Sequence, residues 1–315
     1  MRISIITVCK NAAKDIEKAI KSVANQTYDD LEYIVVDGDS QDGTKEIVNR
    51  YSDKISRFIS EPDNGLYQAM NKGIRYSSGE FIGFLNADDY LVDNLVIGDA
   101  VRFLSKHPSC DFLYGDLEVR YSSKKSVIVK PPRPEDALDT LVCGCLPHQA
   151  SLSRAELFFE KIGFFTENYR ISADYEWFLR LLQDETVKLC YYPRTFTSYY
   201  VGGLSSQIRL SLPESYSIQN RFPLYQEDYW LKRRILKYQE FVINLREWLA
   251  NAETSRDVLE EKYEALQKDY QSLASQYHKV KDELEQMREA IAQPSNPHQP
   301  STEMETESLQ PVDFS

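Results

Sequence analysis

The sequence lacks the long hydrophobic runs and the excess of positive charge that mark two large classes of protein. No apolar run reaches the roughly 18 residues needed to span a bilayer, so no transmembrane segment is predicted. Lysine and arginine total 37 against 49 acidic residues, which gives a net charge of −12 at pH 7. A nucleic-acid-binding protein needs a basic face to engage phosphates, so the composition argues against that class. Residues 1–8 are too short and too alternating for a signal peptide and are typical of a first strand.

Cysteine is also scarce. The five cysteines are an odd number and do not have the spacing of a disulfide framework, which indicates a reducing compartment and a cytoplasmic protein. Cys143-Gly144-Cys145 could hold a metal or form a redox pair, but neither a second thiol pair nor a histidine cluster accompanies it. We therefore interpret Cys143 and Cys145 as buried thiols.

What is present predicts an α/β domain over residues 1–228. With 42% hydrophobic and 12% aromatic residues, the chain has ample material for a core. Apolar segments of strand length alternate with segments of helical period, which predicts a Rossmann-like, mainly parallel sheet flanked by helices. The strands are expected at residues 3–8, 31–36, 55–60 and 80–85, and the helices at 16–23, 44–51 and 66–75. Farther on, we expect a hairpin over 112–119 and 127–129, a helix over 174–183 and a strand over 188–192.

Residues 229–291 follow a seven-residue period. The apolar positions are Leu259, Leu266, Leu273, Val280 and Met287, with Tyr263, Tyr270, Tyr277, Leu284 and Ile291 four residues after each. This pattern predicts a coiled coil that joins copies of the chain into a homo-oligomer, since a lone amphipathic helix would drift from strict heptads. A long helix lying across the first domain stays open, mainly for residues 231–249. Residues 292–315 contain four prolines, four acidic residues and no lysine or arginine, which predicts a disordered tail.

An apolar run over residues 81–85 stops at Asn86-Ala87-Asp88-Asp89. Such a run is a buried strand whose carboxyl end delivers acidic side chains to the edge where open α/β sheets bind ligands. Neighbouring carboxylates repel each other unless a cation lies between them and another group. Mg²⁺ and Mn²⁺ prefer oxygen ligands shared with phosphate, so a metal-bridged phosphate ester is one hypothesis. A solvated acidic turn is the other, and this segment alone leaves both open.

Four further segments are candidates for chemistry. The loop after the second predicted strand contains Asp37 and Asp39, which could accept hydrogen bonds from a nucleobase or ribose or could be turn residues. Asp63 and Asn64 precede a helix that carries Lys72, so they could cap it while Lys72 neutralises phosphate. Asp174 opens a later helix as its cap or as a general base. His148 and Gln149 form a polar island that could contact an acceptor, although a lone histidine is more often structural.

In their order along the chain, these motifs resemble the family 2 glycosyltransferases, which share the GT-A fold. The resemblance covers about residues 1–205. It rests on Ile5-Ile6-Thr7-Val8-Cys9-Lys10-Asn11, Ser22-Val23-Ala24-Asn25-Gln26-Thr27, Glu32-Tyr33-Ile34-Val35-Val36-Asp37-Gly38-Asp39-Ser40, Asp63-Asn64-Gly65, Asn86-Ala87-Asp88-Asp89, and Asp174 with Tyr175. Six motifs in this order are specific for the family but barely specific for its substrates.

The resemblance implies that Thr7, Asp37 and Asp39 hold the nucleoside of a sugar nucleotide, most often a UDP sugar. It also implies that Asp88, the last acid of the family's Asp-X-Asp motif, binds Mn²⁺ or Mg²⁺ at the diphosphate. Asp174 matches the base of inverting members. The nucleotide-sugar site is then expected to comprise Thr7, Asn11, Asp37, Asp39, Asp63, Asn64, Lys72, Asn86, Ala87 and Asp88, with His148 and Gln149 as candidates for the acceptor site.

Two positions depart from the family pattern. Asn86 replaces the first acid of Asp-X-Asp and removes one charge from the metal site, although an amide oxygen can still ligate a metal. Ala173 stands where an acid usually precedes the base. These departures leave open an alternative protein class, a coiled-coil scaffold that binds sugar nucleotides with weak or no catalysis. A nucleotidyltransferase ranks last, because residues 7–11 contain no glycine for a phosphate loop.

We therefore predict a metal-dependent, inverting hexosyl- or N-acetylhexosaminyl-transferase. Family members often build cell-surface polysaccharide or glycolipid, which implies a saccharide or lipid-linked acceptor. Such an acceptor would be reached from the cytoplasm, either by a soluble protein or by one that is peripheral at the inner face of the membrane.

Overall fold

The computed structural model describes residues 1–122, 125–203 and 206–292, with side chains to residue 289. The chain divides into two units, one spanning Met1–Phe241 and a second that begins at Val242. The first unit contains every strand in the described residues. The described part of the second unit is one continuous stretch of helix.

A single sheet forms the centre of the first unit, in the order β3-β2-β1-β4-β8-β6-β9-β5, with β7 paired to β6. The first four strands in this order are parallel, as predicted, and the strands beyond them pair in both directions, so the sheet is mixed. The strands are β1 (Ile3–Cys9), β2 (Leu31–Asp37), β3 (Arg57–Ser60), β4 (Phe81–Phe84), β5 (Tyr90–Leu91), β6 (Phe112–Ser122), β7 (Lys125–Val129), β8 (Ser151–Arg154) and β9 (Leu189–Tyr200).

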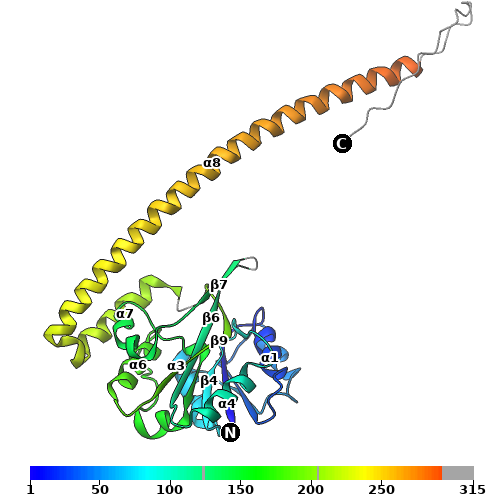
Figure 1. Cartoon of the computed structure of the whole chain (residues 1–315). Coiled ribbons are helices and arrows are strands. Elements are labelled where there is room, and N and C mark those ends of the chain that lie inside the picture. The colour runs from blue at the N-terminus through cyan, green and yellow to red at the C-terminus, as the bar shows by residue number, and fades with distance from the viewer. Residues whose placement is uncertain (123–124, 204–205, 293–315) are drawn as a thin grey trace, which may run out of the picture. The chain divides into compact units, whose positions relative to one another are not determined.

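Helices cover both faces of this sheet, which confirms the predicted α/β class (Figure 1). The α-helices are α1 (Ile16–Ala24), α2 (Thr44–Asn49), α3 (Leu66–Tyr76), α4 (Val96–Lys106), α5 (Ala137–Thr140), α6 (Ala173–Gln183), α7 (Ile208–Arg221) and α8 (Asp228–Ala292). Short helical turns lie at Pro134–Asp136, His148–Ala150, Leu157–Lys161 and Pro223–Gln226.

Alternation along the strands sends side chains into two separate cores. In β1, Ile6 and Val8 contribute to the core under α3 and α6, whereas Ile3 and Ile5 contribute to the core under α1 and α4. Successive side chains of a strand point to opposite faces, so a strand that is apolar throughout must be covered on both. The result is a three-layer arrangement whose middle layer presents the strand ends along one edge.

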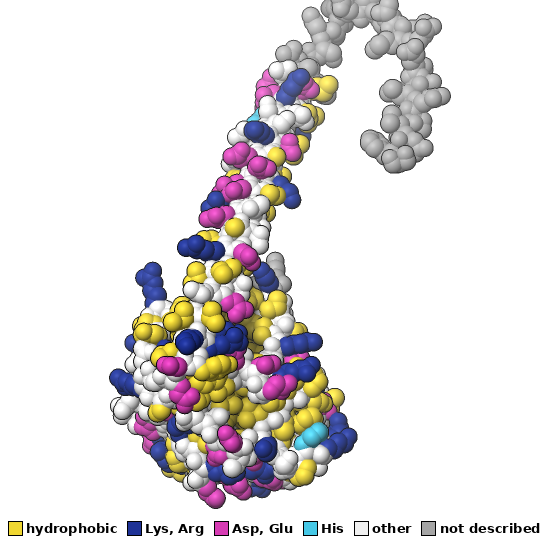
Figure 2. Space-filling view, turned by 60° about the vertical axis from the view of Figure 1, so that its left-hand side comes forward, with side chains coloured by type: hydrophobic (Ala, Val, Ile, Leu, Met, Phe, Trp, Pro, Cys, Tyr) yellow, Lys and Arg dark blue, Asp and Glu magenta, His cyan; other side chains and the backbone are white. Residues whose placement is uncertain are grey.

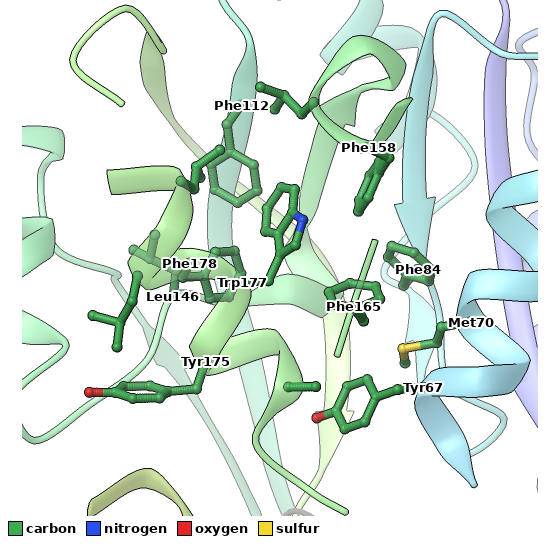
Figure 3. Packing of buried hydrophobic residues seen from close by; sticks show 14 of the residues in the cluster. Tyr67, Met70, Phe84, Phe112, Leu146, Phe158, Phe165, Tyr175, Trp177 and Phe178 are labelled. Atoms are coloured by element: carbon green, nitrogen blue, oxygen red, sulfur yellow. The ribbon is translucent and has the colours of Figure 1, made fainter. Parts of the chain in front are cut away.

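Aromatic packing fixes the position of α6. Trp177 stacks on Phe158 with ring centroids 4.8 Å apart and also contacts Phe112, Phe165 and Phe178 (Figure 3). Its indole N–H donates a hydrogen bond to a backbone carbonyl 2.8 Å away, so its polar atom is satisfied. Truncating a buried aromatic of this kind costs about 3–5 kcal/mol. The start of α6, which carries Asp174, is therefore held rigidly on the sheet.

The C-terminal ends of the parallel strands lie along one edge, as the sequence predicts. Cys9 pairs with Asp37 in the β1–β2 ladder, and Ile6 pairs with Phe84 in the β1–β4 ladder. The residues that follow these strands, including Asn86 and Asp88, consequently emerge at the same edge.

The first turns of α8 belong to the first unit. Arg233 and Lys237 pair with Asp139, and the Tyr238 hydroxyl donates to the side chain of Gln219 at 2.7 Å. The compact unit therefore extends to Phe241, past the boundary at residue 228 expected from the sequence pattern.

The second unit presents its apolar heptad positions to solvent. The leucine and tyrosine positions between residues 259 and 287 are all more than half exposed. Within the described residues of this unit, the helix provides no partner surface that could cover them. For Ile291 and Ala292 the structure describes the backbone only. The rest of the predicted tail, residues 293–315, lies outside the described residues.

Candidate functional site

A cavity of about 280 Å³ opens at the C-terminal edge of the parallel strands. Its walls come from the ends of β1 and β4, the start of α3, the turn before β8, the start of α6 and the end of β9. Seven of the predicted site residues line this one cavity: Asn11, Asn86, Ala87, Asp88, His148, Gln149 and Asp174. Lys10, Asp15, Tyr67, Tyr199 and Gly203 also line it and were not singled out in the sequence.

The turn that follows β4 buries one of its two carboxylates. Asp89 is almost completely covered, and its carboxylate accepts a hydrogen bond from the Tyr200 amide at 2.9 Å. The Asn86 side-chain amide donates to its other oxygen at 3.3 Å. Burial, together with the charge of Asp88, raises the pKa of Asp89 to about 8. Asp89 is therefore largely neutral at pH 7, which leaves Asp88 as the charged group of this turn.

Asp88 faces the cavity without a cationic side chain on its carboxylate. Burial raises the pKa of Asp88, and the nearby charge of Asp15 adds to the effect. The Arg120 guanidinium donates to the backbone carbonyl of Asp88 at 2.7 Å. A Cβ at Gly203 would lie 3.0 Å from the Asp88 carboxylate, so the chain passes close over this side chain. Gly203 could not be selected from the sequence, because only the fold brings it to Asp88.

The oxygens beside Asp88 fit a hard divalent cation. The side-chain oxygen of Asn86 is buried and has no hydrogen-bond partner. An unpaired buried acceptor is costly, and a metal ligated through oxygen would satisfy it. The described residues contain no cluster of three or more His, Cys, Asp or Glu side chains suited to a metal. Asp88 and Asn86 would therefore supply only part of a cation's oxygen ligands, and the rest would have to come from a bound substrate or water.

Asp174 occupies the first turn of α6 with both carboxylate oxygens engaged. One accepts a hydrogen bond from the His148 ring at Nδ1, 2.9 Å away, and the other accepts from the Tyr67 hydroxyl at 2.8 Å. Burial alone would raise the pKa of Asp174, but these hydrogen bonds and the charge of His148 outweigh it, so the pKa lies below its ordinary value. The side chain remains 18% exposed. Asp174 is thus an ionised carboxylate that is fixed in direction and open to the cavity.

Tyr67 is a site residue that the sequence did not reveal. It lies on α3, 107 positions before Asp174, and its side chain is buried. The hydroxyl also donates to the backbone carbonyl of Ile171. Burial and the Asp174 charge raise its pKa well above the ordinary value, so the group remains a hydrogen-bond donor. A tyrosine in an amphipathic helix resembles any core residue, and only the tertiary structure distinguishes it.

Asp37 and Asp39, at the end of β2, flank Gly38, and Asp63 lies against this glycine. A Cβ on Gly38 would collide with the carboxylate of Asp63, so the two loops meet there only because this residue is glycine. Asp37 is buried and accepts hydrogen bonds from the Ser60 hydroxyl at 2.7 Å and the Ser40 amide at 3.0 Å. Asp39 adopts a positive φ of 60° and pairs with Lys45 at 2.6 Å.

Asn11 links this group to the cavity. It has a positive φ of 52°, a conformation that asparagine tolerates better than most residues. Its side-chain oxygen accepts a hydrogen bond from the Gln41 amide at 2.9 Å. The loops after β1 and β2 are therefore tied together beside the cavity wall.

The other predicted residues lie apart from the cavity wall as the structure describes it. Thr7 is fully buried and accepts a hydrogen bond from Tyr33. The backbone amide of Asn64 donates to the side chain of Gln68. Lys72 pairs with Glu61 at 2.6 Å.

The interpretation of Cys143 and Cys145 needs correction. Both are free thiols, as expected, but both are exposed rather than buried. They lie in the loop after α5, which forms a wall of a second cavity instead of entering the core. An isolated Cys-Gly-Cys segment carries no pattern from which this exposure could be read.

Comparison with known proteins decides the family. The model of glycosyl transferase family 2 matches residues 4–157. A glycosyltransferase of PGL/p-HBAD biosynthesis from Mycobacterium tuberculosis is 31% identical over 209 residues, which cover 65% of this chain and 79% of the relative. This chain belongs to glycosyl transferase family 2. A second glycosyltransferase of that species is 33% identical over 181 residues, which cover 56% of this chain and 68% of that one.

Solved structures share the GT-A-like fold of this glycosyltransferase. The TarS fragment 1–349 of S. aureus, in complex with UDP-GlcNAc, superimposes with a TM-score of 0.58 at 20% identity, covering 74% of this chain and 72% of that one. The mannosyltransferase PcManGT of Pyrobaculum calidifontis, in complex with GDP-Man and Mn²⁺, gives 0.54 at 20% identity, with 70% and 64% covered. At this identity the likeness establishes the fold alone. Across the described residues, no helix combines the length and apolarity needed to span a membrane.

Proposed function

We propose that this protein is an inverting, metal-dependent glycosyltransferase that moves a hexosyl or N-acetylhexosaminyl group from a nucleotide-diphosphate sugar. One observation carries the proposal. A single cavity holds Asp88 beside the unpartnered oxygen of Asn86, and it also holds Asp174, an ionised carboxylate fixed by His148 and Tyr67. The first pair suits a diphosphate with its cation, and Asp174 suits a hydroxyl that must lose a proton.

The donor would lie along the strand ends, with its nucleoside toward Asp37, Asp39 and Asp63 and its diphosphate toward Asp88. UDP is the nucleotide we propose, and the resemblance in sequence together with the TarS complex supports it. Mn²⁺ or Mg²⁺ held by Asp88 and Asn86 would offset the charge on the leaving diphosphate. Asn11 and Ala87 line the same wall and would shape the space for the donor.

Asp174 would act as the general base. It would take the proton of an acceptor hydroxyl while that oxygen bonds to the anomeric carbon and the bond from that carbon to the diphosphate breaks. One base is sufficient for inversion, because no covalent sugar–enzyme intermediate has to form. His148 and Tyr67 would hold the carboxylate in direction and keep it ionised.

The acceptor would be a saccharide or a lipid-linked molecule used in the biosynthesis of cell-surface glycans. The relative named for PGL/p-HBAD biosynthesis supports this class. His148 and Gln149 line the cavity beside Asp174 and would lie next to the acceptor. We place the enzyme in the cytoplasm, at the inner face of the membrane where such acceptors occur.

The second unit would join copies of the enzyme through a coiled coil. Its exposed heptad leucines and tyrosines support this assignment, because exposed apolar seams of this period are covered by a partner helix. A chain ending after Phe241 should then be monomeric in light scattering while the full chain is oligomeric. An unchanged oligomeric state would place the interface in the first unit.

The experiment that tests the proposed function is a thermal-shift panel of sugar nucleotides, each with and without Mn²⁺. Binding to the native state raises the melting temperature by mass action. A metal-dependent increase with one donor, followed by transfer from that donor, is the expected result. If every donor and metal combination left the melting temperature unchanged, a scaffold without catalysis would replace this proposal, and Asn86 would be the first residue to examine.

A further inference from the structure

A second cavity, of about 380 Å³, adjoins the first within the Met1–Phe241 unit. The loop after α5, the start of α6, the helix α7 and the first turns of α8 form its walls. Asp174 and Ile171 line both cavities. The proposed base thus lies where the two spaces meet.

The walls of the second cavity are apolar. Leu141, Val142, Leu212, Tyr216 and Phe241 line it. Leu212 and Tyr216 are each more than half exposed, and Phe241 is 47% exposed. Hydrophobic side chains are also plainly visible on the surface of this unit in Figure 2. Large apolar side chains that remain exposed around a hollow are typical of a ligand site.

Five polar side chains of this wall, Ser172, Tyr175, Ser215, Gln219 and Tyr238, are hydrogen-bonded to one another or to the backbone rather than free for a ligand. The Gln219 side-chain amide donates to the Val142 carbonyl at 3.0 Å and to the Tyr175 hydroxyl at 2.8 Å. Its oxygen accepts from the Tyr238 hydroxyl at 2.7 Å. The Ser215 hydroxyl donates to that of Ser172. A ligand would therefore meet mostly carbon here.

The charges of the lining side chains narrow the chemical class of the ligand further. Among the described residues that line this cavity, Asp174 is the only charged side chain, and no lysine or arginine is present. A phosphate group beside Asp174 would be repelled and would find no cationic partner, whereas proteins bind phosphate with Arg, Lys or backbone N–H groups. The occupant is therefore neutral.

From these observations we infer that the second cavity binds a neutral, apolar aglycone, alkyl or aryl, of an acceptor whose hydroxyl reaches Asp174. The inference rests on the proposed function and narrows its acceptor class, excluding acceptors whose phosphate lies next to the reacting sugar. In the transfer, the acceptor oxygen bonds to the anomeric carbon, the bond to the diphosphate breaks and the proton passes to Asp174. The nucleoside diphosphate leaves from the first cavity while the aglycone stays in the second.

The test compares acceptors that differ only in their aglycone. Octyl and phenyl β-glycosides of glucose, galactose, mannose and N-acetylglucosamine are paired with the methyl glycosides of the same sugars, below the micelle concentration. Each buried methylene contributes about fourfold in affinity, so the octyl member of an accepted pair should exceed the methyl member in kcat/KM by at least about 30-fold. Direct binding of octyl and methyl β-glucoside, followed by saturation-transfer NMR, gives a readout that does not depend on turnover.

A matched pair of variants separates the cavity from the general surface. Leu212→Asp places a charge in the cavity wall, whereas Leu210→Asp changes an exposed leucine of the same helix that does not line the cavity. Leu212→Asp should abolish the octyl preference, and Leu210→Asp, which lies outside the cavity wall, should behave as the wild type and keep its donor hydrolysis unchanged. Equal use and equal binding of octyl and methyl glycosides, or equal effects of the two variants, would overturn the inference.

Failure of the proposed function would look different. The wild type would then neither respond to sugar nucleotides in the thermal-shift panel nor hydrolyse any of them, whatever its affinity for octyl glucoside. Binding of the octyl probe under those conditions would contradict the assignment of the cavity as an acceptor site. Donor binding with no octyl preference would overturn only the aglycone inference.

Discussion

The turn at Asp88 and the start of α6 at Asp174 each place a carboxylate in the same cavity, yet their surroundings act in opposite directions. Asp88 is desolvated and lies near other acids, so its pKa is raised. Asp174 is also desolvated, but His148 and Tyr67 more than compensate, and its pKa is lowered. A carboxylate without a cationic partner leaves room for a cation from outside, whereas one with donors on both oxygens stays ionised and is fixed in direction.

The difference also lies in the oxygens around each group. Beside Asp88, the Asn86 side-chain oxygen is buried without a partner, so the turn is incomplete on its own. Around Asp174 both carboxylate oxygens are already bonded. Asp174 thus has its hydrogen-bond partners in place within the protein, whereas the Asn86 oxygen in the turn of Asp88 has none. Four substitutions can break or sharpen this contrast.

The largest effect is expected from Asp174→Asn. The amide keeps the shape of the side chain but cannot take a proton, so transfer should fall about 10²- to 10⁴-fold. Donor affinity, measured by calorimetry with Mn²⁺ present, should stay close to that of the wild type, because the donor is proposed to lie toward Asp88. Turnover at the wild-type rate would show that another group is the base.

Asp88→Asn should act mainly on the metal and the donor. Loss of the carboxylate proposed to hold the metal should weaken Mn²⁺-dependent donor binding by at least the roughly 10- to 100-fold seen when groups that support metal ligands are removed. Asp15→Asn is the matched control, because Asp15 also lines the cavity and adds to the charge around Asp88. Titration of Mn²⁺ at fixed donor distinguishes the two variants. Equal metal dependence in Asp88→Asn and the wild type would remove Asp88 from the metal site.

Tyr67→Phe should produce a smaller change with a distinctive pH signature. The hydroxyl stabilises the ionised form of Asp174, so its loss raises the pKa of that carboxyl. The acid limb of the activity profile should move to higher pH, and the rate at neutral pH should fall about 3- to 10-fold.

Tyr33→Phe controls for the loss of a buried tyrosine hydroxyl, since Tyr33 donates to Thr7 away from the cavity. It should change stability without moving the acid limb. Coincident pH profiles for wild type and Tyr67→Phe would contradict the positioning role of this hydroxyl.

Asp89→Asn tests the buried member of the acidic turn and should have the smallest effect. Folding raises the pKa of Asp89 from 3.8 to about 8, so the native state holds a proton that the unfolded state has released. Stability of the wild type should therefore decline as pH rises through this interval. The amide resembles the protonated acid, so the variant should lose this part of the decline. Urea unfolding at a series of pH values, with metal removed by chelation, measures the slope, and parallel slopes would contradict a neutral Asp89.

Much of this arrangement could be predicted from the sequence. Strands that are largely apolar and separated by amphipathic helices dictate a buried parallel core, and β1, β2 and β4 follow that rule, whereas β3 contains no buried residue. The same rule puts Asp37 and Asp88 at one edge of the sheet. Identical reasoning cannot find β5, which has only two residues, or β8, whose sequence Ser-Leu-Ser-Arg contains a single apolar residue.

The pairing around Asp174 was beyond prediction for a different reason. His148 was recognised only as a polar island, and Tyr67 was not selected, because contacts across 26 and 107 positions depend on how α3, α6 and the turn at His148 pack. Lys72 shows the converse case. It lies on the helix where the sequence predicts a phosphate-neutralising lysine, but its side chain pairs with Glu61. Sequence pattern locates an edge of the sheet, while the identity of neighbours there depends on tertiary packing.

The stereochemistry of transfer tests the central claim most directly. Asp174 is proposed to take a proton from the acceptor, so the sugar should be displaced once and its anomeric configuration should invert. The anomeric proton coupling of the freshly formed product, followed by ¹H NMR with the donor identified in the thermal-shift panel, reports the outcome. Inverted configuration is the predicted result, and retained configuration would contradict the account, because it would require two displacements or attack from the face of the leaving group.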